Sequence, residues 1–222
     1  MSTPPGVAGV LLAAGEGARF GKPKALAEFA GEPLADRGVR LLRDGGAMPV
    51  IVVTGAATVE LGWDLADVIV AHNPGWRAGM GSSLAVGLTA APAAARAAVV
   101  ALVDQPLVGP QAVRRLVTAY LGGAAVAVAA YHGQMRNPVL IAREHWAEVI
   151  ERAAGDVGAR PFLRAHPELV TVVECGDTGD PADADTPEDL AMLARRVSAA
   201  RTAAPRRGTH PGQVPGRSGP AR

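Results

Sequence analysis

Residues 10–26 read VLLAAGEGARFGKPKAL, and this stretch decides how the rest of the chain is interpreted. An apolar run ends at Gly15, and a glycine-rich loop follows that carries three cations, Arg19, Lys22 and Lys24. Glycine permits backbone turns that other residues avoid, and the N–H groups of such a loop can converge on an anion. Taken alone, the loop also fits an ordinary strand-to-helix turn with solvated cations. The cations favour a polyphosphate site, because arginine and lysine both bind phosphate oxygens.

Length and composition restrict the class of protein. The chain has 222 residues, 49% of them hydrophobic, which is enough for a single domain with a sizeable core. Its formal net charge of +1 gives no general attraction to nucleic acid or to an anionic membrane. The first residues lack the basic region of a signal peptide, and no apolar run approaches the roughly 18–20 residues of a membrane span. We therefore expect a cytoplasmic protein with neither a nucleic-acid partner nor a membrane partner.

Apolar runs alternate with amphipathic stretches along the chain. We expect strands over residues 6–13, 49–54, 67–71, 97–103, 124–131, 138–142 and 169–174. We expect helices over residues 32–43, 82–90, 110–120, 144–152, 159–165 and 187–196. This alternation predicts an α/β fold with parallel strands at the centre of its sheet. Residues 198–222 are basic and rich in Pro, Gly and Arg, so we expect a folded domain over residues 1–197 and a disordered tail after it.

An acidic turn, Asp104-Gln105-Pro106, follows the expected strand over residues 97–103. Ligands of such sheets bind outside the carboxyl ends of the strands, where both this turn and the glycine-rich loop lie. The carboxylate of Asp104 could hold Mg²⁺ through oxygen, or it could simply stabilise a turn before the proline. The agreement in position between the loop and the acid favours a nucleotide site with a metal.

Four further polar strings interrupt the apolar pattern, and each also fits a purely structural interpretation as a helix cap or a surface turn. Thr186 with Asp189 is a capping-box-like helix start, whereas Asp183 and Asp185 lie too close together for both to be caps. The strings are Gly79-Met80-Gly81-Ser82-Ser83-Leu84, Arg136-Asn137-Pro138-Val139-Leu140, Gly155-Asp156-Val157-Gly158-Ala159-Arg160 and Asp183-Ala184-Asp185-Thr186-Pro187-Glu188-Asp189-Leu190.

Together these strings resemble the motifs of the nucleotidyltransferases of the molybdenum-cofactor type, over about residues 9–193. The glycine-rich loop is similar to the family's L-A-[AG]-G-x-[SG]-x-R-[MF]-G-x-x-K. Asp104-Gln105-Pro106 resembles its D-x-P, and residues 183–189 resemble its D-[IV]-D-T-P-E-D. The resemblance implies a nucleotide-diphospho-sugar transferase-like fold, a three-layer, Rossmann-like α/β domain with a mixed, mostly parallel sheet.

The same resemblance implies which residues bind the nucleotide. Arg19, Lys24 and Asp104 are the expected catalytic residues, with the two cations on the triphosphate. Ala14, Gln105 and the string over residues 79–84 are similar to the cytidylyltransferase branch, which implies CTP, with guanylyl transfer as the alternative. The remaining nucleotide-binding set is Leu12, Ala13, Gly15, Glu16, Gly17, Gly79, Met80, Gly81, Ser82 and Ser83.

The resemblance also implies a metal and an acceptor. Asp104 and Asp185 are expected to bind Mg²⁺, with Mn²⁺ as the alternative ion and Asp183 as the second choice of ligand. A molybdopterin-type acceptor is expected to contact Arg136, Asn137, Pro138, Asp156 and Arg160. Asn137 departs from the small residue or histidine that the family often has there.

The expected reaction is attack of an acceptor phosphate on the α-phosphorus of CTP, with release of pyrophosphate. Two other functions stay open at this point: transfer to a sugar phosphate or another small phosphorylated acceptor, and delivery of cofactor by a non-catalytic chaperone. We expect a monomer, and leave a molybdoenzyme or its chaperone open as a further partner.

Overall fold

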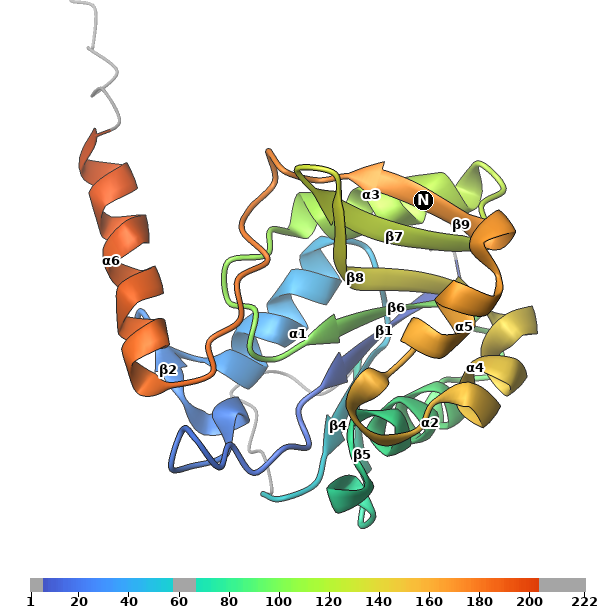
Figure 1. The fold of residues 1–222 in the computed structure, drawn as a ribbon, viewed down its shortest axis with the longest axis horizontal. Helices are drawn as coiled ribbons and strands as arrows, with labels where there is room; N and C mark the ends of the chain where they lie inside the picture. Colours follow the sequence, from blue (N-terminus) through green and yellow to red (C-terminus); the bar gives the residue numbers. More distant parts are fainter. Residues whose placement is uncertain (1–5, 58–66, 204–222) are drawn as a thin grey trace, which may run out of the picture.

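The computed structural model describes residues 6–57 and 67–203. Its main sheet contains β1 (Val7–Leu12), β4 (Val50–Thr54), β5 (Val68–His72), β6 (Ala97–Leu102), β7 (Val126–Tyr131), β8 (Gln134–Ala142) and β9 (Val170–Glu174). The strand order is β5-β4-β1-β6-β8-β7-β9, and only β8 runs antiparallel to both of its neighbours (Figure 1). The mixed, mostly parallel α/β sheet predicted from the sequence is therefore confirmed.

Helices cover both faces of this sheet, which makes the fold three-layered. One face packs against α1 (Leu34–Asp44) and α3 (Pro110–Leu121), and Leu190 and Leu193 from the start of α6 (Pro187–Ala203) join the same core. The other face packs against α2 (Met80–Ala90), α4 (Trp146–Arg152) and α5 (Arg160–Ala165). Since β1, β4 and β6 are buried on both sides, their sequences are continuously apolar instead of alternating.

The first expected helix begins two residues later than the sequence indicates. Residues Glu28–Phe29 (β2) and Glu32–Pro33 (β3) pair as a small antiparallel sheet, and α1 starts only at Leu34. Ala30 and Gly31 between the two strands have φ values of 53° and 81°, which close a tight hairpin. The carboxylate of Glu32 is free of the helix and accepts hydrogen bonds from Arg37 and Arg40.

Strand β8 and helix α6 also differ in extent from the prediction. Strand β8 begins at Gln134, four residues before Pro138, because Gln134 and Met135 pair with the end of β7 in a hairpin. Helix α6 continues to Ala203, so residues 198–203, expected to open the tail, are helical, and residues 204–222 lie outside the described residues. In Figure 1, α6 stands beside β2, apart from the main sheet. Within the described ranges, no helix has the length and apolarity needed to cross a membrane.

The topology gathers several chain segments at one edge of the sheet. Strands β1, β4, β5, β6, β7 and β9 are mutually parallel, so their carboxyl ends share this edge, on the left of Figure 1. The glycine-rich loop follows β1, the acidic turn follows β6, and the loop that carries Asp183 and Asp185 follows β9. The fold therefore brings together three motifs that lie far apart in the sequence.

Close packing of α1 on the central strand depends on a glycine. A Cβ atom at Gly38 would lie 2.6 Å and 2.7 Å from the two δ-carbons of Leu11, which is fully buried in β1. We expect Gly38→Ala to lower the free energy of unfolding by about 1–3 kcal/mol, since overpacking outweighs the better helix propensity of alanine. Denaturant unfolding measures the change. The matched control is Gly75→Ala, whose Cβ meets only the Oδ1 of Asn73 at 3.4 Å, and an equal loss there would contradict the explanation.

Candidate functional site

The glycine-rich loop leaves β1 with several backbone donors directed away from protein acceptors. Among the residues that the structure describes, none of the N–H groups of Gly15, Glu16 and Gly17 donates to a protein group. Gly17 has a φ of +64°, and a Cβ there would lie 2.2 Å from the carbonyl oxygen of Lys22, so this position requires glycine. Buried Phe20 anchors the loop, and Phe20 N–H donates to the Gly17 carbonyl at 2.8 Å. The loop therefore presents a concave set of amide donors suited to an anion.

Lys24 joins the loop to the two acids expected to bind metal. It lies in the short helix η1 (Lys24–Leu26), and its Nζ is 2.9 Å from Asp104 Oδ2 and 2.7 Å from Asp185 Oδ1. The side chain of Lys24 is 17% exposed, whereas Arg19, 3.3 Å from Asp185 Oδ2, is 75% exposed. One cation is thus held inside the site, and the other lies at its rim.

The charges of this cluster stabilise one another. Burial lowers the pKa of Lys24, but the carboxylates of Asp104 and Asp185 outweigh it and leave that pKa raised. The hydrogen bond from Lys24 is the main reason that the pKa of Asp185 is lowered. Lys24 is therefore an ammonium ion and Asp185 a carboxylate at neutral pH.

Asp183 has a different environment from Asp185. Burial, and then the nearby charge of Asp104, raise the pKa of the Asp183 carboxyl group. Its Oδ1 accepts a hydrogen bond from the amide of Gln105 at 2.9 Å, and the same amide donates to the carbonyl of Pro181 at 3.2 Å. Gln105, expected among the nucleotide-binding residues, is 6% exposed and links the acidic turn to the loop over residues 180–185.

A cavity of about 490 Å³ opens beside the cluster. Its wall is formed by the glycine-rich loop with Lys24, the residues over 76–83 at the start of α2, the end of β6 and Asp156. Among the predicted site residues, its lining includes Leu12, Ala14, Gly15, Glu16, Gly17, Lys24, Gly79, Met80, Ser83, Asp104 and Asp156. Ala13 points to the other face of the sheet, where it packs in the core that contains α1.

The start of α2 is fixed by a buried asparagine that the sequence analysis did not single out. Asn73 is 3% exposed, and its amide donates to the hydroxyl oxygens of Ser82 at 2.9 Å and Ser83 at 3.0 Å. Its Oδ1 accepts from Gly75 N–H, which is the Asx turn that an Asn-Pro pair before glycine favours. Ser83 lines the cavity, whereas Ser82 is not part of its lining.

The string over residues 155–160 packs directly on the start of α2. Gly79 has a φ of +103°, and a Cβ there would lie 2.4 Å from the carbonyl carbon of Gly155. The carboxylate of Asp156 accepts the Met80 N–H at 3.2 Å, so it occupies a backbone donor of α2. Gly81 also packs closely on this segment, since a Cβ atom added there would lie 2.7 Å from the carbonyl of Ala153.

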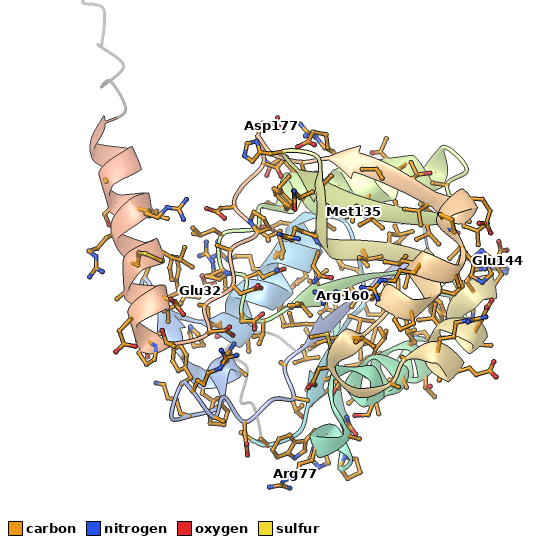
Figure 2. The ribbon with its side chains drawn as sticks, in the orientation of Figure 1. Glu32, Arg77, Met135, Glu144, Arg160 and Asp177 are labelled. Carbon is orange, nitrogen blue, oxygen red and sulfur yellow. The ribbon has the colours of Figure 1, made fainter. Side chains whose placement is uncertain are left out.

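The residues expected to bind the acceptor separate into two places. Asn137 and Arg160 line a small cavity of about 60 Å³ that shares Leu12 and Met80 with the large one. Figure 2 shows Arg160 near the middle of the view, whereas Glu144 lies at its right-hand edge. Arg136 lines a separate hollow beside the β7–β8 hairpin, and Pro138 is buried.

Four residues of the large cavity were not expected at the site, namely Trp76, Arg77, Leu102 and Val103. Trp76 lies partly buried in the cavity wall. The guanidinium of Arg77 lies 4.3 Å from the centre of the Trp76 ring, and the arginine is exposed at the cavity rim (Figure 2). No charge pattern in the sequence distinguishes Arg77 from other surface arginines.

The chemistry of the donor set fits a divalent cation only when the substrate also contributes ligands. Within residues 6–57 and 67–203, no three histidine, cysteine or acidic side chains gather as a metal-binding group. Asp104 and Asp185 are close enough to share one ammonium group. Two carboxylates completed by phosphate oxygens are an arrangement that Mg²⁺ accepts.

Comparisons with known proteins agree with this geometry. A curated relative from Paenarthrobacter nicotinovorans, nicotine blue oxidoreductase, is 36% identical over 85% of this chain and 97% of its own length. A probable molybdenum cofactor guanylyltransferase from Opitutus terrae is 39% identical, over 46% of this chain and 50% of its own length.

Solved structures share the fold. A homologue of Mycobacterium tuberculosis Rv0371c, from a Mycobacterium species (strain JC1), superposes with a TM-score of 0.76 and 28% identity, over 89% of this chain and all of its own. A manganese complex of Rv0371c from Mycobacterium tuberculosis gives a TM-score of 0.65 and 27% identity, over 85% of this chain and 98% of its own.

One family model decides the classification. The model described as the MobA-like NTP transferase domain matches residues 9–170, which include the glycine-rich loop, the acidic turn and the start of α2. The chain therefore belongs to the MobA-like NTP transferase family and is an enzyme of the nucleotidyltransferase class.

Proposed function

We propose that this enzyme transfers CMP from CTP to the phosphate of a molybdopterin-type acceptor and releases pyrophosphate. The observation that carries the proposal is the arrangement of Lys24 and Asp104 in the wall of a 490 Å³ cavity that the glycine-rich loop also lines. A cavity of this size accommodates a ligand as large as a nucleotide. The free amide donors of the loop lie beside it, where a triphosphate would need them.

The residues of the chain contribute mainly position and charge. An acceptor phosphate is already ionised at neutral pH, so its oxygen can attack the α-phosphorus without a general base. The bond between the α-phosphorus and the oxygen that bridges it to the β-phosphate breaks, and pyrophosphate leaves with the negative charge. Lys24 and Arg19 would neutralise negative charge on the triphosphate and the leaving group, while the amides of residues 15–17 hold it in line for attack.

Asp104 and Asp185 would hold Mg²⁺, with Mn²⁺ as the alternative. When bound, the ion would supply positive charge to phosphate oxygens of the reactants. The manganese complex of the related Rv0371c supports a divalent metal in a protein of this fold. Asp185 is preferred to Asp183 because Asp185 contacts Lys24 and Arg19, whereas Asp183 is engaged by Gln105.

The choice of CTP depends on the wall of the cavity. Ala14 stands where guanylyltransferases tend to have glycine, and it lines the cavity together with Met80 and Ser83. The guanylyltransferase from Opitutus terrae is the reason to keep GTP as the alternative nucleotide. Asn137 and Arg160, in the small adjoining cavity, are the side chains best placed for the acceptor. A sugar phosphate as acceptor, or delivery of cofactor without turnover, stays an alternative.

One observation favours a second candidate function. The relative named nicotine blue oxidoreductase matches 85% of the chain, so a redox reaction of nicotine blue with a separate electron donor or acceptor is a second candidate. The two functions differ in their products, pyrophosphate in one case and oxidised or reduced nicotine blue in the other.

The nucleotide is tested by measuring pyrophosphate release with each of the four common nucleoside triphosphates, molybdopterin-type cofactor and Mg²⁺. We expect turnover with CTP to exceed turnover with GTP by at least about tenfold, an energy difference of about 1.4 kcal/mol. Equal or faster turnover with GTP would overturn the CTP assignment. A change in the absorbance of nicotine blue with a supplied electron donor or acceptor, without pyrophosphate release from any triphosphate, would support the second candidate instead.

The acids are tested by Asp104→Asn and Asp185→Asn. Each change removes one carboxylate from the proposed metal site, and we expect kcat to fall by about 10²-fold or more, since a bound ion is worth several kcal/mol in the transition state. Steady-state kinetics over a range of Mg²⁺ concentrations measures the effect. Asp177→Asn is the control of equal charge, because Asp177 is exposed and pairs with Arg115. A similar loss in all three variants would contradict the assignment.

Lys24 is tested against its neighbour in the same loop. Lys24→Met keeps the length of the side chain but removes the ammonium group, and we expect kcat/KM for CTP to fall by about 10²-fold, the usual effect of losing a positioned electrostatic group. Lys22→Met removes an exposed cation three residues from Arg19 and should change kcat/KM less than threefold. If Lys22→Met and Lys24→Met lower kcat/KM equally, general electrostatic attraction of the triphosphate explains the effect instead.

A further inference from the structure

The acidic turn over residues 104–108 is held on one side by the loop that carries the second acid. The carbonyl of Asp104 accepts Ala184 N–H at 2.8 Å, and the carbonyl of Leu107 accepts Asp180 N–H at 3.0 Å. The side chain of Gln105 adds its two hydrogen bonds to the same loop. These contacts bring Asp104 and Asp185 together, and all of them join the acidic turn to the loop over residues 180–185.

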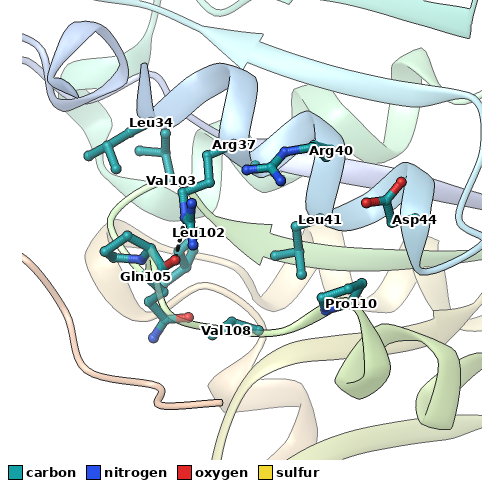
Figure 3. A pocket seen from close by; sticks show the side chains of 12 residues that line it. Leu34, Arg37, Arg40, Leu41, Asp44, Leu102, Val103, Gln105, Val108 and Pro110 are labelled. Carbon is teal, nitrogen blue, oxygen red and sulfur yellow. Dashed lines mark hydrogen bonds between the residues drawn. The ribbon is translucent and has the colours of Figure 1, made fainter. Parts of the chain in front are cut away.

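On the opposite side, a side chain of α1 hydrogen-bonds to the turn. The Nε of Arg37, from α1, donates to the carbonyl of Pro106 at 2.5 Å, the dashed contact in Figure 3. A cavity of about 90 Å³ separates α1 from the turn, lined by Arg37, Gln105 and Pro106 among others. Val103 and Val108 pack in the same core as α1, and among the described residues the hydrogen bond from Arg37 is the polar contact that holds the Pro106 carbonyl to this helix.

The guanidinium of Arg37 is itself held in place. Glu32 accepts a hydrogen bond from Arg37 Nη1 at 3.4 Å, and the guanidinium carbon lies 5.0 Å from the centre of the Phe29 ring. Both partners belong to the β2–β3 hairpin, and Arg40 binds the same carboxylate without contacting the turn. Arg37 is absent from the lining of the 490 Å³ cavity and lines the separate space between α1 and the turn.

We infer that Arg37 is a positioning residue, which fixes Asp104 for metal binding by holding the Pro106 carbonyl against α1. This inference rests on the proposed function, since it takes Asp104 to be a metal ligand. Asp104 lies two residues before Pro106 in one tight turn, so a shift of the carbonyl displaces the carboxylate. A displacement of about 1 Å is enough to cost roughly 10²-fold in rate.

The experiment compares three variants in a titration with Mn²⁺ alone, followed by electron paramagnetic resonance. Arg37→Met keeps the apolar stem and loses every donor, and we expect the Mn²⁺ dissociation constant to rise about tenfold or more, as for other groups that support metal ligands. Arg37→Lys keeps one donor and should give a smaller rise. Arg40→Met is the matched control, which loses the other partner of Glu32 and should bind Mn²⁺ within twofold of the wild type.

The alternatives give different results. If Arg37→Met binds Mn²⁺ like the wild type, the inference is wrong while the proposed function stands. If Arg40→Met weakens Mn²⁺ binding as much as Arg37→Met does, loss of charge or of stability explains the effect, and the inference is again wrong. If wild type and Asp104→Asn bind Mn²⁺ equally, the metal site itself fails, and the proposed function fails with it. If Arg37→Met does not fold, Arg37→Lys provides the test. Wild-type Mn²⁺ binding by Arg37→Lys, together with an unchanged dependence of kcat on Mg²⁺, would overturn the inference.

Discussion

The site depends on one ammonium group shared by two carboxylates. Lys24 contacts Asp104 and Asp185, which lie 80 and 161 positions further along the chain. Two carboxylates at this distance from a common atom would repel each other without a cation between them. The lysine therefore makes it possible for the protein to hold both acids in place before any ligand binds.

Several other features of the fold stabilise the contact of Lys24 with the two acids. The parallel strands deliver the glycine-rich loop, the acidic turn and the last loop to the same edge of the sheet. Gly17 brings the backbone at Lys22 close enough for Lys24 to turn inward. Gln105 binds the last loop from the turn, and Arg37 holds the turn from the side of α1. Backbone contacts therefore stabilise the glycine-rich loop, whereas side chains from three different elements hold the two acids in place.

The sequence was most informative where a residue's role depends on its immediate neighbours. The buried strands could be predicted because β1, β4 and β6 are continuously apolar, and the position of Asp104 followed from the end of β6. The direction of a side chain could not be predicted, since Gln105 turns away from the cavity only because Asp183 and Pro181 lie behind it. The support from Arg37 could not be predicted for the same reason, because it bonds to a segment 69 positions away whose place is set by the tertiary fold.

The position of Asp185 has a consequence for how the site can be lost. All seven strands of the main sheet end by Glu174, so Asp185 belongs to none of them. The loop over residues 180–185 is held to the acidic turn by the N–H groups of Ala184 and Asp180 and by the side chain of Gln105. Local opening of these few contacts would leave the sheet and Asp104 in place but remove one of the two partners of Lys24. The charge arrangement of the site can therefore open at a lower free energy than the fold that carries it.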